Sequence, residues 1–200
     1  MIILAIDTTG ELGSIAITDG EDVIEEVVLK SGDGLDHVLF GEIENLLARN
    51  RVSVADIGGF ASASGPGTFT GVRVGLTAVK GLAEGMSRQV AAVSNLRAMS
   101  YFGTRDLRAP FVDARRGDIY GAVYNAALEA VCEEVVMKHD VWLASLPAGV
   151  EILSERRPMA AAIGRIAARD FAAGRGLDPA VVDANYVRRA DAEMLWKDVV

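Results

Sequence analysis

Hydrophobic positions in the first 30 residues recur in short runs of the length and period of β-strands. Residues 1–7 form an apolar run that ends at Asp7, and two further runs follow over residues 13–20 and 21–29. β-Branched residues in runs of this length are typical of strands. Asp19-Gly20, between the second and third runs, is a hairpin signal. The pattern therefore predicts an antiparallel meander of three strands.

The hydrophobic period then changes to that of a helix. Apolar residues from Leu35 to Asn50 share one helical face. A strand of small residues is predicted over 58–64, a second helix after the glycine-rich loop that follows, and a strand over 89–94. A further helix is predicted over 95–103, capped by Ser94 or Asn95. The order βββαβαβ with right-handed crossovers gives an α/β fold with a mixed five-stranded sheet, which is the actin-like, ribonuclease-H-like topology.

The second half of the chain has a less regular pattern. Strands are predicted over 109–125, 128–137 and 149–155, and an Ala-rich helix over 157–174 with Pro158 in its first turn. Residues 178–189 are expected to end the ordered part. We therefore predict a two-lobed chain, with a first actin-like lobe over residues 1–107 and a second, shortened lobe over 108–200. A return of the last residues to the first lobe is compatible with this prediction.

The helix after the glycine-rich loop has almost no polar face. Between Gly71 and Glu84 its polar side chains share an arc of roughly 60°, so the apolar surface is about twice as wide as the ~100° stripe of an ordinary surface helix. Two interpretations remain open. Either the chain's own sheet and neighbouring helices bury this helix, or one side of it meets a second polypeptide together with the helix at 35–50.

The glycine-rich loop itself matches neither the Walker spacing nor the dinucleotide-binding spacing of glycines. It also lacks the spacing of a serine nucleophile elbow. We interpret it as a tight strand-to-helix turn, in which Pro66 and Gly67 supply the special backbone angles and Thr68 or Thr70 caps the helix.

Candidate ligands and nucleophiles are few. His37 and His139 lie in unrelated contexts, so we expect no metal site. Cys132, the single cysteine, lies in an apolar alternation and is interpreted as a small buried hydrophobe. The residues after the first strand, 7–9, are interpreted as closing a turn, with contact to a nucleotide or anion as the alternative.

Composition narrows the function classes. The 200 residues carry a net charge of −8, which disfavours stand-alone binding to nucleic acid unless a basic partner or a local basic patch supplies the contacts. A single cysteine excludes an internal disulfide. No signal-peptide pattern is present, and no apolar run approaches the ~20 residues of a membrane span. We expect a cytoplasmic protein that does not bind membranes.

Three segments of the chain form a distinctive set: "ILAIDTT" over 3–9, "SGPGTFTGVRVGLTAVKGLA" over 64–83 and "VDARRGDIY" over 112–120. Together they resemble the TsaB (YeaZ) family, the dimerisation subunit of the bacterial machinery that makes threonylcarbamoyladenosine in tRNA. The resemblance implies a non-catalytic scaffold that pairs with the transferase TsaD. The ATPase TsaE docks on the pair, and the scaffold dimerises when alone. The resemblance further implies that the chain contacts tRNA only through the complex. It implies no cofactor of the chain's own, with ATP or ADP as a candidate ligand at the surface shared with partners. The alternative is an actin-like ATP-binding hydrolase or peptidase that acts alone.

The resemblance also implies that pairing uses the two helices around 37–47 and 70–80. Within these helices we select apolar side chains that lie where the apolar stripe is wider than packing against one sheet requires. We add polar residues at the edge of the stripe. The expected interface residues are His37, Phe40, Leu47, Thr70, Val72, Arg73, Leu76, Val79 and Lys80. The candidate nucleotide or anion contacts are Asp7, Thr8 and Thr9, and no residue is assigned a catalytic or metal-binding role. For Arg115 and Arg116 two interpretations stay open: contact with tRNA, nucleotide or the third subunit, or a solvated surface position.

Overall fold

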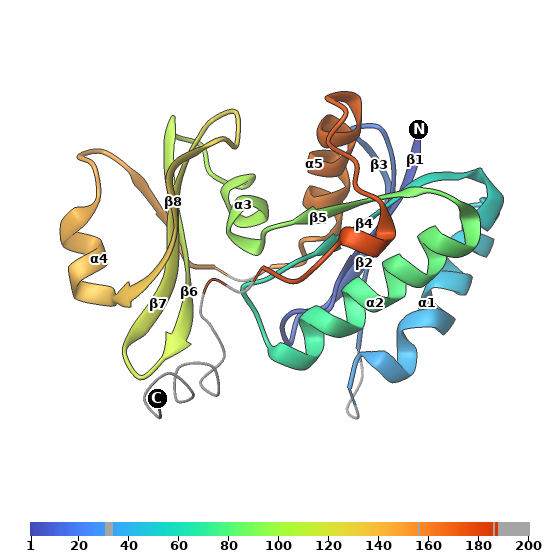
Figure 1. Cartoon of the computed structure of the whole chain (residues 1–200), viewed down its shortest axis with the longest axis horizontal. Coiled ribbons are helices and arrows are strands. Elements are labelled where there is room, and N and C mark those ends of the chain that lie inside the picture. The colour runs from blue at the N-terminus through green and yellow to red at the C-terminus, as the bar shows by residue number, and fades with distance from the viewer. Residues whose placement is uncertain (31–33, 156, 186, 188–200) are drawn as a thin grey trace, which may run out of the picture.

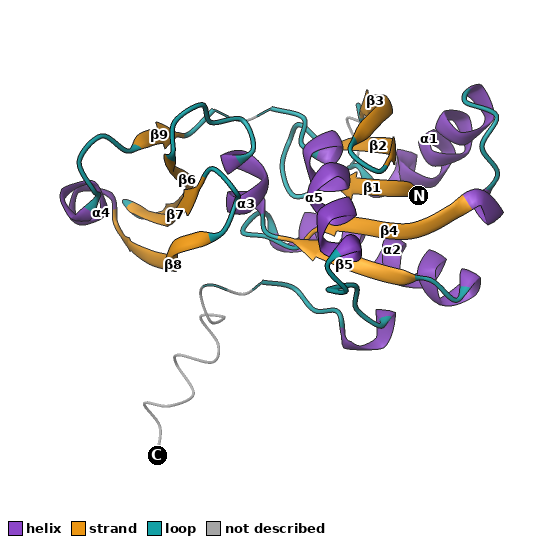
Figure 2. Ribbon diagram, turned by 90° about the horizontal axis from the view of Figure 1, so that it is seen from above, coloured by secondary structure: helices purple, strands orange, loops and turns teal. Residues whose placement is uncertain are grey.

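Two β-sheets divide the molecule into two lobes (Figure 1). The computed structural model describes residues 1–30, 34–155, 157–185 and 187. The short helix α3 (Asn95–Ser100) lies between the two sheets, as Figures 1 and 2 both show. Ser94 caps this helix through its side chain, as one of the two predicted caps. The passage from one lobe to the other therefore runs through α3.

The first lobe contains a five-stranded sheet in the order β3-β2-β1-β4-β5. Its strands are β1 (Ile2–Asp7), β2 (Ser14–Asp19), β3 (Asp22–Val28), β4 (Ile57–Ala63) and β5 (Gln89–Val93). The first three form an antiparallel meander, and β4 and β5 run parallel to β1. Gly20 has a φ of +57° between β2 and β3, the left-handed conformation that a two-residue hairpin requires. The predicted fold class and the order βββαβαβ are confirmed.

Helices cover both faces of this sheet, which explains why β1, β4 and β5 consist mainly of buried, apolar residues. The covering helices are α1 (Asp36–Arg49), α2 (Phe69–Met86) and α5 (Ala160–Ala172). α1 and α2 pack on the face that carries Leu4 and Ile6. α5 packs on the opposite face, against Ile3 and Ala5. α5 therefore completes the core of the first lobe, although it follows the second lobe in the chain.

The second lobe repeats the topology of the first in reduced form. Its strands are β6 (Leu107–Arg115), β7 (Asp118–Asn125), β8 (Ala130–Lys138) and β9 (Glu151–Leu153). Within the described residues they form a four-stranded sheet in the order β8-β7-β6-β9. Three antiparallel strands are again followed by a strand parallel to the first of them.

The structure of the second half differs from the prediction in two places. α5 begins at Ala160 after a cap at Met159, so Pro158 precedes the helix instead of lying in its first turn. A short helix, α4 (His139–Ser145), was not predicted. It is anchored by Trp142, which packs so closely on Gly121 that a Cβ there would lie 2.5 Å from the indole nitrogen.

The apolar surface of α2 is covered mainly by the chain itself. One side packs on the sheet and on α1, with Leu76 and Val79 in the common core. A segment from the far end of the chain covers another side, where Val182 is buried beside α2 and its carbonyl accepts a hydrogen bond from Lys80 Nζ at 2.7 Å. Just before Val182, residues Pro179–Val181 form a 3₁₀ turn against α2. The first of the two interpretations thus holds for most of this helix.

Candidate functional site

An open groove between α1 and α2 is the part of this apolar surface that stays exposed. Its volume is about 590 Å³. Two large side chains stand out in it: Phe40 from α1 is 57% exposed, and Phe69 from the first turn of α2 is 58% exposed. The groove is lined by Asp36, Leu39, Phe40, Phe69, Thr70, Arg73, Val74, Thr77, Ala78, Gly81 and Leu82.

Arg73 is held at this groove by an aromatic contact. Its guanidinium carbon lies 3.5 Å from the centre of the Phe69 ring, a cation–π arrangement that fixes a long side chain over an apolar surface. Asp36 lies on α1, across the groove from Arg73. Its Oδ2 is 3.9 Å from Nε2 of the exposed His37. The groove therefore has an aromatic centre with charged groups of both signs around it.

Of the predicted interface residues, four are not on this exposed surface. Leu47, Val72, Leu76 and Val79 are at most 6% exposed and lie in the core shared with the sheet. The prediction that they occupy the uncovered part of the stripe is wrong, because the helices are rotated so that these side chains face the sheet. Lys80 is also engaged within the chain, through its bond to the Val182 carbonyl.

The remaining predicted residues lie where a partner could reach them. Phe40, Thr70 and Arg73 line the groove, and His37 is exposed beside it. Phe69 was missed because the prediction treated it as part of the loop. It is the first residue of α2, directly after the cap at Thr68. A large apolar residue directly after a threonine cap could have been placed on the helix from the sequence.

The turn after β1 is closed by its own side chains. Asp7 accepts hydrogen bonds from the backbone N–H and the hydroxyl of Thr9, at 2.9 and 2.7 Å. The Thr8 hydroxyl donates to the carbonyl of Gly71 at 2.6 Å. Asn95 from α3 donates to the Thr9 hydroxyl. These side chains are buried, and their polar atoms serve to join β1, α2 and α3.

The start of α2 packs directly on this turn. A Cβ on Gly71 would lie 2.0 Å from the Thr8 carbonyl oxygen, and one on Gly67 would lie 2.7 Å from the Thr9 carbonyl oxygen. Glycine at both positions therefore allows close backbone contact. The residue with a left-handed backbone is Gly65, at a φ of +105°, so the assignment of the special angles to Gly67 is wrong.

Thr68 is the helix cap, and its hydroxyl accepts a hydrogen bond from the backbone N–H of Gly71 at 3.2 Å. The alternative, Thr70, already lies within the helix.

Glu134 on β8 joins the second lobe to the first. It accepts hydrogen bonds from the hydroxyl of Ser94, from the hydroxyl of Tyr124 at 2.8 Å and from the amide of Asn185 at 2.6 Å. Burial and the adjacent Glu134 carboxylate raise the pKa of Tyr124 above its usual value. The backbone N–H of Asn185 also donates to the carbonyl of Ser64 at 2.8 Å. Asn185 is thereby tied to both lobes.

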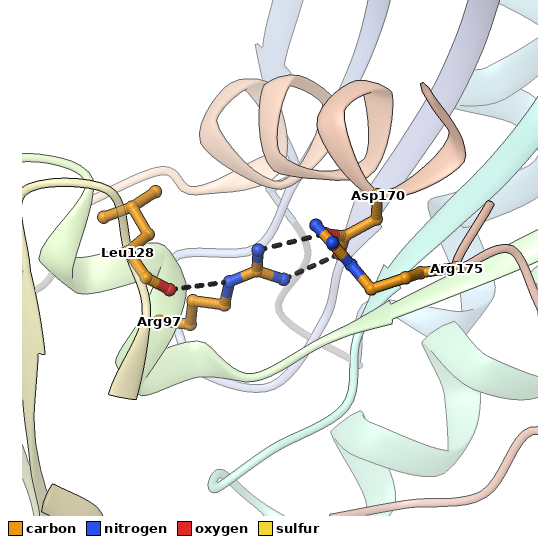
Figure 3. Close-up of polar contacts among 4 residues, drawn as sticks. All are labelled: Arg97, Leu128, Asp170 and Arg175. Carbon is orange, nitrogen blue, oxygen red and sulfur yellow. Dashed lines mark hydrogen bonds and ion pairs between the residues drawn. The ribbon is translucent and has the colours of Figure 1, made fainter. Parts of the chain in front are cut away.

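A second junction surrounds Asp170 of α5 (Figure 3). Arg97 from α3 reaches its carboxylate with two nitrogens, at 2.6 and 3.0 Å, and donates to the carbonyl of Leu128. Arg175 binds the same carboxylate from the other side. Burial alone would raise the pKa of Asp170, but the hydrogen bonds from the two arginines outweigh it and hold the pKa below its usual range. The sequence pattern did not indicate this cluster.

Cys132 is exposed on β8, so its interpretation as a buried hydrophobe is wrong. β8 is an edge strand of its sheet, and its first four residues are exposed. Over the described part of the chain, no group of three His, Cys, Asp or Glu side chains could hold a metal ion. No helix in that part is long and apolar enough to cross a membrane.

The two sheets, with equivalent strand orders and α3 between them, define an actin-like, ribonuclease-H-like two-lobed protein. A family model described as "TsaD: tRNA N6-adenosine threonylcarbamoyltransferase" matches residues 36–172. The Bacillus subtilis tRNA threonylcarbamoyladenosine biosynthesis protein TsaB is 33% identical over 162 residues, which are 80% of this chain and 69% of the relative. The Escherichia coli protein of the same name is 35% identical over 130 residues, 62% of this chain and 55% of the relative. The chain belongs to the TsaB/YeaZ family.

A solved structure supports the same fold. It is a Pseudomonas aeruginosa protein described as uncharacterized with similarity to peptidase YeaZ, and it superposes with a TM-score of 0.82 at 22% identity, over 94% of this chain and 99% of that one. At this identity the likeness shows the fold alone. The chain thus spans all but 1% of this structural neighbour, but little more than half the length of the Escherichia coli relative.

Proposed function

We propose that this chain is a cytoplasmic, non-catalytic subunit in the biosynthesis of threonylcarbamoyladenosine in tRNA, and that it pairs with the transferase TsaD through the groove between α1 and α2. The observation that carries the proposal is the exposure of Phe40 and Phe69 in one apolar groove. Large exposed apolar side chains that share a patch are typical of protein interaction sites.

The names of the relatives support the biological role. The Bacillus subtilis and Escherichia coli relatives are named for threonylcarbamoyladenosine biosynthesis. The match to the TsaD family model over residues 36–172 supports a partner of related fold, since related subunits can pair through equivalent helices. Two helices from each subunit would then form a four-helix interface.

The shape of the groove suits a helical partner. Its lining includes Ala78 and Gly81, which are small enough to allow a second helix to approach closely. Phe40 and Phe69 stand on opposite walls, one on each helix. Aromatic side chains and arginine dominate the binding energy of protein interfaces, and Arg73 lies over the Phe69 ring. The same surface would serve for self-association when the partner is absent.

The turn after β1 supports a role without catalysis. The alternative of an ATP-binding hydrolase rested on Asp7, Thr8 and Thr9, whose polar atoms bond to one another and to Gly71 and Asn95. The first turn of α2 packs on the same backbone. We therefore place ATP or ADP at the surface shared with partners, and we expect TsaE and tRNA to join through the complex.

Pairing is tested with Phe69→Glu and Phe40→Glu. Each places a charge in the groove without disturbing a buried side chain, so the protein should stay folded while its affinity for TsaD from the same organism falls at least 100-fold. The measurement is light scattering coupled to size-exclusion chromatography of the mixed subunits, with circular dichroism to verify folding.

The matched control is Val141→Glu on α4 of the second lobe, which is 56% exposed and lies outside the groove. It should pair as well as the unmodified protein. A further contrast is Leu76→Glu, which should unfold the chain because this side chain is only 5% exposed. Pairing that survives both phenylalanine substitutions would refute the assignment of the groove.

A further inference from the structure

The turn between β6 and β7 contains three consecutive residues with a left-handed backbone. Their φ angles are +67° at Arg115, +56° at Arg116 and +78° at Gly117. Glycine adopts this conformation readily, whereas arginine does so rarely. Asn-Gly or Asp-Gly is the ordinary choice for such a turn. The chain thus has two arginines where the backbone disfavours them, and strain of this kind concentrates at functional sites.

The guanidinium groups of both residues are available to a ligand. Arg115 and Arg116 are exposed, and neither side chain forms a hydrogen bond or ion pair with any other described residue. Neighbouring carboxylates have other contacts. Asp113 accepts a hydrogen bond from the backbone N–H of Arg115 at 2.8 Å, and Asp118 pairs with Lys138 at 2.8 Å.

Contacts from β8 and α4 hold this turn in place. Lys138 Nζ donates to the carbonyl of Arg116 at 2.9 Å, and the backbone N–H of His139 donates to the carbonyl of Gly117 at 3.2 Å. The ring of His139 in turn lies 4.9 Å from that of Phe111 on β6. Because these contacts hold the backbone of the turn, the arginines are presented without the cost of ordering a loop on binding.

We propose that this turn binds the phosphate backbone of RNA through Arg115 and Arg116. Guanidinium groups match phosphate oxygens in charge and in fork geometry. The chain carries a net charge of −8, which repels RNA over most of the surface. RNA is therefore expected to approach where cationic side chains are exposed together. The turn lies along the same lower edge of the molecule in Figure 1 as the N-terminal end of α2. An RNA that also contacts a partner in the groove would have to extend along this edge to the turn, and in this respect the proposal rests on the proposed function.

The test uses the full chain and a fluorescein-labelled transfer-RNA transcript in fluorescence anisotropy between 20 and 150 mM salt. With both arginines replaced, Arg115→Asn and Arg116→Asn, the slope of log affinity against log salt should become shallower by about 1.5 to 2. The melting temperature of the same variant should rise by about 1–3 °C, because asparagine tolerates a left-handed backbone better than arginine does. If the two arginines had a purely structural role, their replacement would not weaken RNA binding and at the same time stabilise the fold.

Arg51 supplies the matched control. It is exposed after α1 in the other lobe, has a φ of +56°, and makes no side-chain hydrogen bond or ion pair with the described residues. Arg51→Asn should raise the melting temperature similarly but leave the salt slope unchanged.

Three results overturn the proposal: no salt-dependent RNA binding by the unmodified chain, an unchanged slope in the double variant, or an equal loss in Arg51→Asn. The proposal would also be overturned if the double variant paired more weakly with TsaD while its affinity for RNA stayed unchanged. That result would assign the turn to a protein partner. Phe69→Glu tests pairing through the groove and leaves the turn unchanged. A failure of the proposed function can therefore be told apart from a failure of the RNA-binding proposal.

Discussion

Replacing Asp170 with alanine should destabilise the protein by about 3 kcal/mol, because it leaves a largely buried guanidinium without its counter-charge. Arg97 contributes most of this energy. Its side chain is 22% exposed, whereas that of Arg175 is 58% exposed, so solvent screens the second pair strongly. We therefore expect about 2–3 kcal/mol for Arg97→Ala and less than about 1 kcal/mol for Arg175→Ala.

Thermal unfolding followed by circular dichroism measures these changes. For a chain of this size about 1 kcal/mol corresponds to 2–4 °C, so Asp170→Ala should lower the melting temperature by about 6–12 °C at pH 7. A loss for Arg175→Ala as large as that for Arg97→Ala would refute the assignment of the energy to the buried pair.

The effect should also depend on pH. The folded protein holds the pKa of Asp170 below its ordinary value of 3.8, so the charged carboxylate stabilises the fold above that value. This contribution is lost as the pH falls through the lower, folded-state pKa. The difference in stability between the unmodified protein and Asp170→Ala should therefore be constant from pH 7 to about pH 4 and shrink below it. A difference that stays constant down to pH 2 would contradict the charge argument.

Two further predictions concern the contacts that join the elements. Gly71→Ala should prevent stable folding or lower the melting temperature by more than about 10 °C, because the added Cβ would lie 2.0 Å from the Thr8 carbonyl oxygen. The control is Gly81→Ala on the same helix, where nothing lies within 4 Å of an added Cβ. This control should be neutral or stabilising. Glu134→Gln should lower stability by about 1–2 kcal/mol through weaker bonds to Ser94, Tyr124 and Asn185, measured by urea unfolding; no change would mean that the cluster contributes little to joining the lobes.

Local periodicity was sufficient for most of the fold. The strands of the first sheet are short apolar runs, α1 and α2 have apolar residues at helical spacing, and α5 is rich in alanine, so their type follows from the sequence. α4 lacked this signal. It has seven residues, of which Trp142 is buried while Val141 and Leu143 are exposed. One anchoring side chain does not make a recognisable stripe.

The candidate site shows what periodicity cannot resolve. The width of the apolar stripe on α2 indicated that more than one neighbour covers the helix, but not which neighbour. Val182, over 100 positions along the chain from Leu76, supplies part of that cover. Long-range contacts of this kind decide which side chains remain exposed. The sequence therefore located the helices of the groove, while the exposure of Phe69 and the half-burial of Val74 became visible only in the structure.

The burial of Val182 has a consequence for how the protein folds. α5 and the segment that ends near Asn185 complete the first lobe on two sides, although the whole second lobe precedes them in the chain. During synthesis the first sheet emerges early, but two of its covering layers emerge last. The N-terminal lobe cannot finish folding on the ribosome ahead of the C-terminal one, and expression of residues 1–107 alone should yield an aggregation-prone fragment with its apolar faces bare.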